Sequence, residues 1–101
     1  MKWYHYIACF FAGIFLTNAI PHFIHGISGD PFPTPFANPP GKGLSSPVLN
    51  TIWGAGNMIV GGFLFKVSKL SWNNKLAIFI FFAAVLCMSF ISSIVFTDRM
   101  R

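Results

Sequence analysis

The segment PHFIHGISGDPFPTPFANPPGKGLSSP, residues 21–47, separates two strongly hydrophobic parts of the chain. It contains all seven prolines of the protein, four of its nine glycines and two of its three histidines. Prolines at the alternating positions 31, 33 and 35 favour an extended backbone, and the Pro-Pro-Gly sequence at 39–41 is typical of a turn. The segment therefore predicts a connection between two hydrophobic elements that contains an extended stretch and a turn.

The composition of this connection argues against a disordered linker, which would be rich in charged residues and poor in aromatic ones. Its charged residues are only Asp30 and Lys42, and it carries Phe32 and Phe36. We therefore expect residues 26–46 to form a structured loop that packs on the rest of the protein.

Outside the loop, the sequence is too hydrophobic for a soluble domain. Hydrophobic residues make up 54% of the chain and charged residues 9%, compared with about 25% charged residues in a typical soluble domain. Residues 3–29, 43–65 and 76–97 contain no charge, and each interval exceeds the roughly 20 residues that a helix needs to cross a bilayer. We predict an all-α integral membrane protein, a single membrane domain over 1–101. Its transmembrane helices are expected at about 3–25, 47–67 and 75–97, with a short hairpin at 68–74.

The basic residues indicate a membrane surface rather than nucleic acid. The net charge is +5, but the lysines and arginines stand singly at the ends of hydrophobic segments, unlike the clustered basic face of a nucleic-acid-binding protein. Anionic lipid headgroups are the expected counterpart. The end of the molecule with the N-terminus and residues 68–74 carries four basic residues: Lys2, Lys66, Lys69 and Lys75. The end with the loop and the C-terminus carries three: Lys42, Arg99 and Arg101. This bias predicts a cytoplasmic N-terminus, with the loop and C-terminus outside.

Small and polar residues form regular stripes on two of the predicted helices. Asn50, Gly54, Asn57 and Gly61 follow one another at i, i+4, i+7 and i+11, which is one helix face. In lipid, small residues let helix backbones approach closely and amides bond across helices, so we expect this face to pack against protein. The third helix carries a shorter strip that includes Ser89 and Ser93, for which we expect the same role.

The first helix adds a third polar face, with Asn18, His22 and His25 at i, i+4 and i+7. A rise of 1.5 Å per residue puts these polar groups and those of the two stripes mostly in the half of the bilayer nearest the loop. Polar residues inside a membrane are costly and often functional, although asparagines can also serve only to hold helices together. Our candidate residues for binding a ligand or partner are Asn18, His22, His25, Asp30, Phe32, Phe36, Asn50, Trp53 and Asn57.

No catalytic residue, metal or cofactor is predicted. His22, His25 and Asp30 are the only candidate metal ligands, and neither an H-E-x-x-H motif nor a cysteine ligand set accompanies them. Serines lie near the histidines, but the G-x-S-x-G sequence of a hydrolase nucleophile is missing. A non-enzymatic function is therefore expected.

Two functions remain open from the sequence. The first is a small binding or accessory membrane protein, whose polar pocket beneath the loop holds a partner subunit, a lipid or a small amphipathic ligand. The alternative is a small homo-oligomeric transporter or channel that uses the Asn, His and Gly stripes as its permeation path. Because three helices have little surface to shield such stripes, we expect a homo-oligomer or a subunit of a larger membrane complex.

Overall fold

A computed structural model describes residues 1–99 of the chain. It contains three long helices, α1 (Trp3–Ile27), α2 (Pro47–Val67) and α3 (Lys75–Thr97). At 1.5 Å per residue each is roughly 31 to 38 Å long, enough to cross a hydrocarbon core of about 30 Å. All three are also hydrophobic enough to do so. The predicted fold of three membrane-length helices is confirmed, and by helix length and composition the chain is a small multi-span integral membrane protein.

The loop between α1 and α2 adds one short element to the helices. Strands β1 (Phe32–Pro33) and β2 (Leu44–Ser45) pair antiparallel, with Phe32 opposite Ser45. The α2 helix then begins directly after β2. Ser46 Oγ accepts a hydrogen bond from the backbone N–H of Leu49 at 3.1 Å, and Pro47 occupies the first helical turn, where a missing N–H costs nothing.

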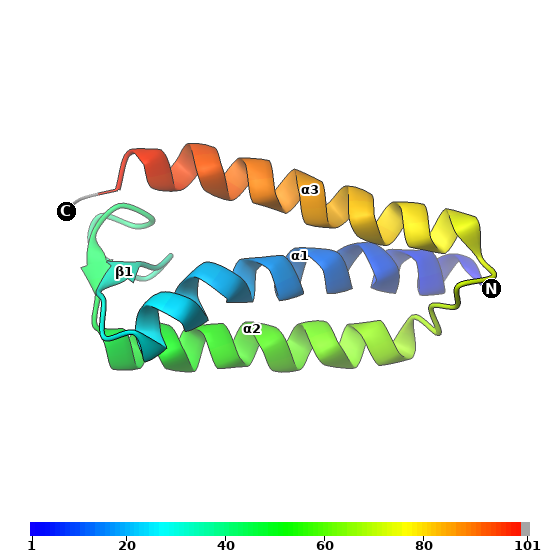
Figure 1. The fold of residues 1–101 in the computed structure, drawn as a ribbon, viewed down its shortest axis with the longest axis horizontal. Coiled ribbons are helices and arrows are strands. Elements are labelled where there is room, and N and C mark those ends of the chain that lie inside the picture. The colour runs from blue at the N-terminus through cyan, green and yellow to red at the C-terminus, as the bar shows by residue number, and fades with distance from the viewer. Residues whose placement is uncertain (100–101) are drawn as a thin grey trace.

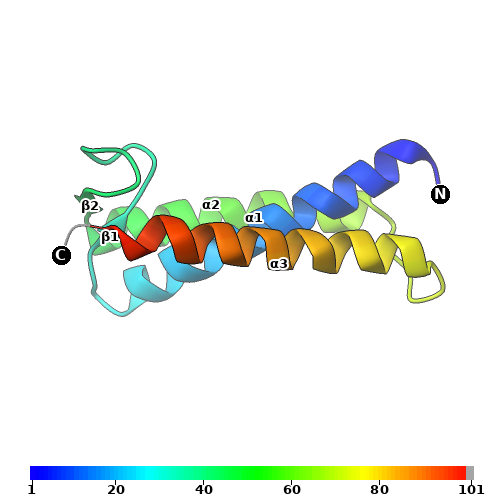
Figure 2. The ribbon, with the colours of Figure 1, turned by 90° about the horizontal axis from the view of Figure 1, so that it is seen from above.

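Helix α1 lies between the other two helices and packs against both (Figure 1). Seen from the perpendicular direction, it crosses them obliquely (Figure 2). The loop and the end of α3 lie at one end of the molecule, and the N-terminus and the 68–74 connection lie at the other (Figure 1). The loop therefore covers only one end of the helix bundle.

The contact between α1 and α2 is close because glycines line it. The buried residues of α2 are Asn50, Gly54, Asn57 and Gly61, one continuous stripe. A Cβ atom added to Gly54 would lie 2.6 Å from the backbone nitrogen of Phe23 on α1. One added to Gly61 would lie 2.7 Å from Leu16 Cγ. The absence of side-chain carbon at these two positions lets the helix backbones approach to a separation that larger residues would prevent.

Small residues also mediate the contact between α1 and α3. A Cβ atom on Gly13 of α1 would lie 2.7 Å from the carbonyl oxygen of Phe81. Ala77 and Ala84 are the buried residues of α3. Most of the large hydrophobic side chains of α3 point outward, Phe79, Phe90 and Ile94 among them. This exposed hydrophobic surface is consistent with direct contact between α3 and the lipid bilayer.

Candidate functional site

Asn50 joins the loop to α2 through its buried side-chain amide. The residue is fully buried, and its Nδ2 donates to the carbonyl oxygens of Phe32 at 2.9 Å, Ser45 at 3.2 Å and Ser46 at 3.1 Å. These carbonyls belong to β1, to β2 and to the residue that caps α2. A single amide therefore holds both strands of the loop against the start of the helix.

The same side chain also contacts α1. Asn50 Oδ1 lies 3.0 Å from Nδ1 of His22, and the imidazole of His22 is only 1% exposed. Phe32, Trp53 and Phe96 surround the ring edge-on, with centroids between 5.5 and 6.3 Å away. His22 is thus held in one orientation at the junction of α1, α2 and the loop.

Phe32 anchors the loop between the ends of α1 and α3. Its ring is 3% exposed and stacks on His25, with centroids 4.2 Å apart and planes 13° from parallel. It also lies 4.7 Å from the Phe96 ring, and the Arg99 guanidinium stands 5.6 Å from its centroid. Fully burying a phenylalanine contributes about 1.5 to 3 kcal/mol, so this contact is a major attachment of the loop.

The tip of the loop is fastened separately. The hydroxyls of Thr34 and Ser45 lie 2.6 Å apart and share a hydrogen bond across the hairpin. Phe36 packs edge-on against Trp53 of α2, with centroids 5.4 Å apart, although Phe36 itself is 53% exposed. These contacts hold residues 34–36 over the helices rather than away from them.

Deeper along α1 and α2, two asparagines bond across the helix contact. Asn18 Nδ2 donates to Asn57 Oδ1 at 3.1 Å, and Asn57 Nδ2 donates to the carbonyl of Trp53 at 2.8 Å. Both the oxygen and the NH₂ group of the Asn57 side chain therefore form hydrogen bonds within the protein. The Oδ1 atom of Asn18, by contrast, accepts no hydrogen bond from residues 1–99.

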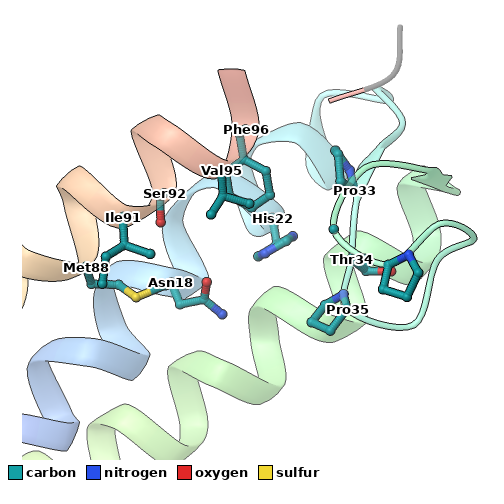
Figure 3. A pocket seen from close by; sticks show the side chains of 12 residues that line it. Asn18, His22, Pro33, Thr34, Pro35, Met88, Ile91, Ser92, Val95 and Phe96 are labelled. Carbon is teal, nitrogen blue, oxygen red and sulfur yellow. The ribbon is translucent and has the colours of Figure 1, made fainter. Parts of the chain in front are cut away.

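A cavity of about 350 Å³ lies beneath the loop, between α1 and α3 (Figure 3). Its polar lining comes from Asn18, His22, Thr34 and Ser92, and hydrophobic residues, proline and glycine form the remaining wall: Pro33, Pro35, Pro40, Gly41, Met88, Ile91, Val95 and Phe96. The Oγ atom of Ser92 is buried and has no hydrogen-bond partner among the described residues. The site is therefore a mostly apolar chamber with a few unpaired polar atoms.

The predicted binding residues take three different places around this cavity. Asn18 and His22 line it, and Phe32, Phe36, Asn50, Trp53 and Asn57 support the loop and α1 around it. His25 instead lines a more open groove between α1 and α3, together with Ser89 and Ser93, for which a packing role was predicted. Ser89 Oγ donates to the carbonyl of Val85 within its own helix, at 2.6 Å. None of these three residues lines the cavity, although Ser92 and Phe96 line both the cavity and this groove.

Sequence reasoning did not identify Ser92, although it lines the cavity. The sequence offers Ser-Ser at 92–93, and the i, i+4 spacing from Ser89 favoured residue 93. Adjacent helical residues point about 100° apart, so the rotation of α3 about its axis decides which serine faces α1. α3 packs closely on α1 at Gly13, and the local pattern of α3 does not encode a contact with another helix.

The candidate metal ligands His22, His25 and Asp30 do not come together around a common point. Nδ1 of His25 lies 3.9 Å from Oδ2 of Asp30, whose side chain is 62% exposed, while Nδ1 of His22 faces Asn50. Within residues 1–99, no three His, Cys, Asp or Glu side chains come together at a distance suited to a metal ion.

Comparison with known proteins found no family model that matches the chain and no similar curated protein or solved structure. The site is therefore interpreted from its own geometry.

Proposed function

We propose that this protein is a non-enzymatic membrane binding protein that holds a small amphipathic molecule in the cavity beneath the loop 26–46. The observation that carries the proposal is the buried, unpartnered hydroxyl of Ser92 in the otherwise apolar wall that α3 forms. A buried polar atom without a partner costs about 1 to 3 kcal/mol. A bound molecule with one polar group and an apolar body would relieve that cost.

The volume of the cavity supports a small ligand. Ligand sites commonly enclose about 300 to 1,000 Å³, and an apolar cavity of about 150 Å³ already binds benzene. At about 350 Å³, the chamber has room for a molecule of one or two rings or for part of a lipid chain.

The position of the cavity supports entry from the bilayer. Ile91 and Val95 form part of its wall, yet they are 47% and 43% exposed on the outer surface of α3. The wall is therefore continuous with the lipid-facing surface. A molecule dissolved in the membrane can reach the chamber without passing through water.

A homo-oligomeric transporter is the alternative to this function, and it receives less support. That function needs polar side chains that face an aqueous path. Asn50 instead uses its amide on the loop and on His22 of α1. Asn57 uses its amide on Asn18 of α1 and on the Trp53 carbonyl of its own helix. The glycines of the same stripe lie within the close contact between α1 and α2. We therefore assign the stripe to helix packing and the cavity to binding.

Association with other subunits is part of the proposal. The outward faces of α2 and α3 are hydrophobic and are available to lipid, to a second copy of the chain or to another membrane protein. An accessory role would appear as a stoichiometric partner when the protein is purified in mild detergent. A binding protein that acts alone would purify without one.

Native mass spectrometry of the full-length protein, released from mild detergent, tests the function. We expect the wild type to carry a small-molecule adduct. Ile91→Phe, which fills the cavity, should lose it. Ile94→Phe is the matched control, since Ile94 lies on the same helix, is 71% exposed and lines no part of the cavity. An adduct that persists in Ile91→Phe, or a wild type that binds nothing from a total lipid extract, would contradict the proposal.

A further inference from the structure

We infer that the molecule held in the cavity is an uncharged ring compound with a hydroxyl group, of the phenol or hydroquinone class, and that its O–H donates to Nε2 of His22. This inference rests on the proposed function and adds the chemistry of the ligand. It depends on which nitrogen of His22 carries the proton, and the contacts of Asn50 determine that.

The orientation of the Asn50 amide is the first step. One end of the amide lies between 2.9 and 3.2 Å from the carbonyl oxygens of Phe32, Ser45 and Ser46. Carbonyl oxygens only accept hydrogen bonds, so this end is the NH₂ group. The other end, which faces His22, is therefore the oxygen.

The proton position on His22 follows from this orientation. An amide oxygen only accepts, so Nδ1 of His22, 3.0 Å away, is the donor and carries hydrogen. Aromatic rings surround the imidazole, and His22 forms no ion pair with either acid among residues 1–99, where Asp30 pairs with His25 instead. A buried charge without a counter-ion is costly, so the site accommodates the neutral ring. Its Nε2 then has a lone pair and no hydrogen.

The free acceptors of the cavity point to a ligand that donates. The His22 ring projects into the chamber (Figure 3), and its Nε2 forms no hydrogen bond within the described part of the chain. Asn18 donates its NH₂ group to Asn57, which leaves its oxygen as a second acceptor. Ser92 can donate or accept. With two free acceptors, one unpaired hydroxyl and no cationic side chain in its lining, the cavity suits a hydroxyl and disfavours a carboxylate or phosphate.

The apolar wall favours a ring as the body of the ligand. Phe96 and the edge of the His22 imidazole line one side, and Met88 lies further along α3. Aromatic side chains and thioether sulfur both make favourable contacts with rings. The volume of about 350 Å³ has room for a body of one or two rings.

Two matched probes, 2-naphthol and 2-methoxynaphthalene, test the inference on the full-length protein in lipid nanodiscs. They share their ring system, and only naphthol has an O–H to donate. After correction for partition into empty nanodiscs, we expect naphthol to bind roughly 3- to 10-fold more tightly, as one net hydrogen bond allows. His22→Phe should remove this preference. His25→Phe, outside the cavity, should retain it.

The outcomes separate the two proposals. Equal binding of both probes by the wild type would leave the proposed function standing and overturn the hydroxyl-donor inference. If neither probe binds saturably, the proposed function fails and the inference fails with it.

A measurement on the wild type covers the case in which His22→Phe does not fold. In protein with ¹⁵N-labelled histidine, NMR should show His22 protonated at Nδ1 and unprotonated at Nε2. Added naphthol should then shift the Nε2 signal of His22 and leave that of His25 in place. A proton found on Nε2 of His22 in the ligand-free protein would overturn the inference.

Discussion

Nδ1 of His22 and Oδ1 of Asn50 lie 3.0 Å apart, and this contact joins α1 to α2 at the point where the loop returns to the helices. The NH₂ group of the same asparagine holds the carbonyls of both loop strands. The position of the loop and the orientation of the imidazole are therefore coupled through one side chain. A change at Asn50 acts on the cover of the cavity and on its wall together.

Replacing Asn50 should strongly destabilise the protein. Asn50→Ala removes the side-chain hydrogen bonds to the carbonyls of Phe32 and Ser45 and leaves Nδ1 of His22 without a partner. A buried donor without a partner alone costs about 1 to 3 kcal/mol. We expect the free energy of unfolding in mixed micelles, followed by helical circular dichroism during an SDS titration, to fall by about 2 to 4 kcal/mol. Asn73→Ala is the control, because Asn73 is exposed in the 68–74 connection, and it should change stability by less than about 0.5 kcal/mol. Equal SDS midpoints for the two variants would contradict this role of Asn50.

The effect on stability of replacing a glycine of α2 with alanine should depend on the helix face that the glycine occupies. In Gly54→Ala the new methyl group would meet the backbone of Phe23, forcing the helices apart at a cost of about 1 to 3 kcal/mol. Gly56→Ala and Gly62→Ala meet nothing within 4 Å, and alanine is the better helix former by up to about 1 kcal/mol. These two variants should be neutral or stabilising in the same SDS titration. A Gly54→Ala protein as stable as Gly56→Ala would show that the α1–α2 contact is looser than the structure indicates.

The helices were predictable from sequence because each is determined by local composition. Charge-free intervals longer than a membrane crossing and a Ser-Pro start at 46–47 are properties of short segments. The α2 stripe was visible for the same reason, since one helix face follows from residue spacing alone, and the structure buries those four residues. The sequence also indicated a structured loop, because Phe32 and Phe36 need a surface to pack on.

The cavity itself depends on relations between segments that are distant in the chain. The choice of Ser92 over Ser93 follows from the rotation of α3 against α1. The two-residue strands are too short to leave an alternating pattern, and Asn50 binds carbonyls, which every residue possesses. No residue pattern marks the particular carbonyls that an amide will meet.

Removing the Phe32 ring should release the loop without unfolding the helices. Phe32→Ala loses the contacts with His25 and Phe96, and such truncations of buried rings cost about 3 to 5 kcal/mol. Lys42 is the only Lys or Arg between Lys2 and Lys66, so trypsin cleavage there reports on the loop. Cleavage after Lys42 should accelerate roughly 10-fold or more, while helical circular dichroism in detergent stays unchanged. Phe36→Ala, half exposed in the wild type, should have a much smaller effect on the cleavage rate. Equal rates for the two variants would argue against Phe32 as the anchor.

The charge bias predicts which end of the molecule faces outward. In a background with Cys9 and Cys87 replaced by alanine, Lys42→Cys on the loop should react with a membrane-impermeant maleimide in intact cells. Asn73→Cys, at the opposite end, should react only after permeabilisation. The reverse pattern would invert the topology. Partial labelling of both positions in intact cells would indicate that the chain inserts in both orientations, which a difference of four basic residues against three permits.

Ser92 should show opposite effects on stability and on binding. Its hydroxyl is buried without a partner, so Ser92→Ala removes an unsatisfied group and should raise the stability of the ligand-free protein by up to about 1 kcal/mol. The same change takes a hydrogen-bonding atom from the cavity, and adduct occupancy in native mass spectrometry should fall severalfold. Ser89→Ala is the matched control on the same helix, because Ser89 Oγ bonds within α3 and lies outside the cavity. That variant should leave occupancy unchanged. A loss of ligand-free stability in Ser92→Ala would show that the hydroxyl serves packing, since a group that only awaits a ligand cannot stabilise the empty protein.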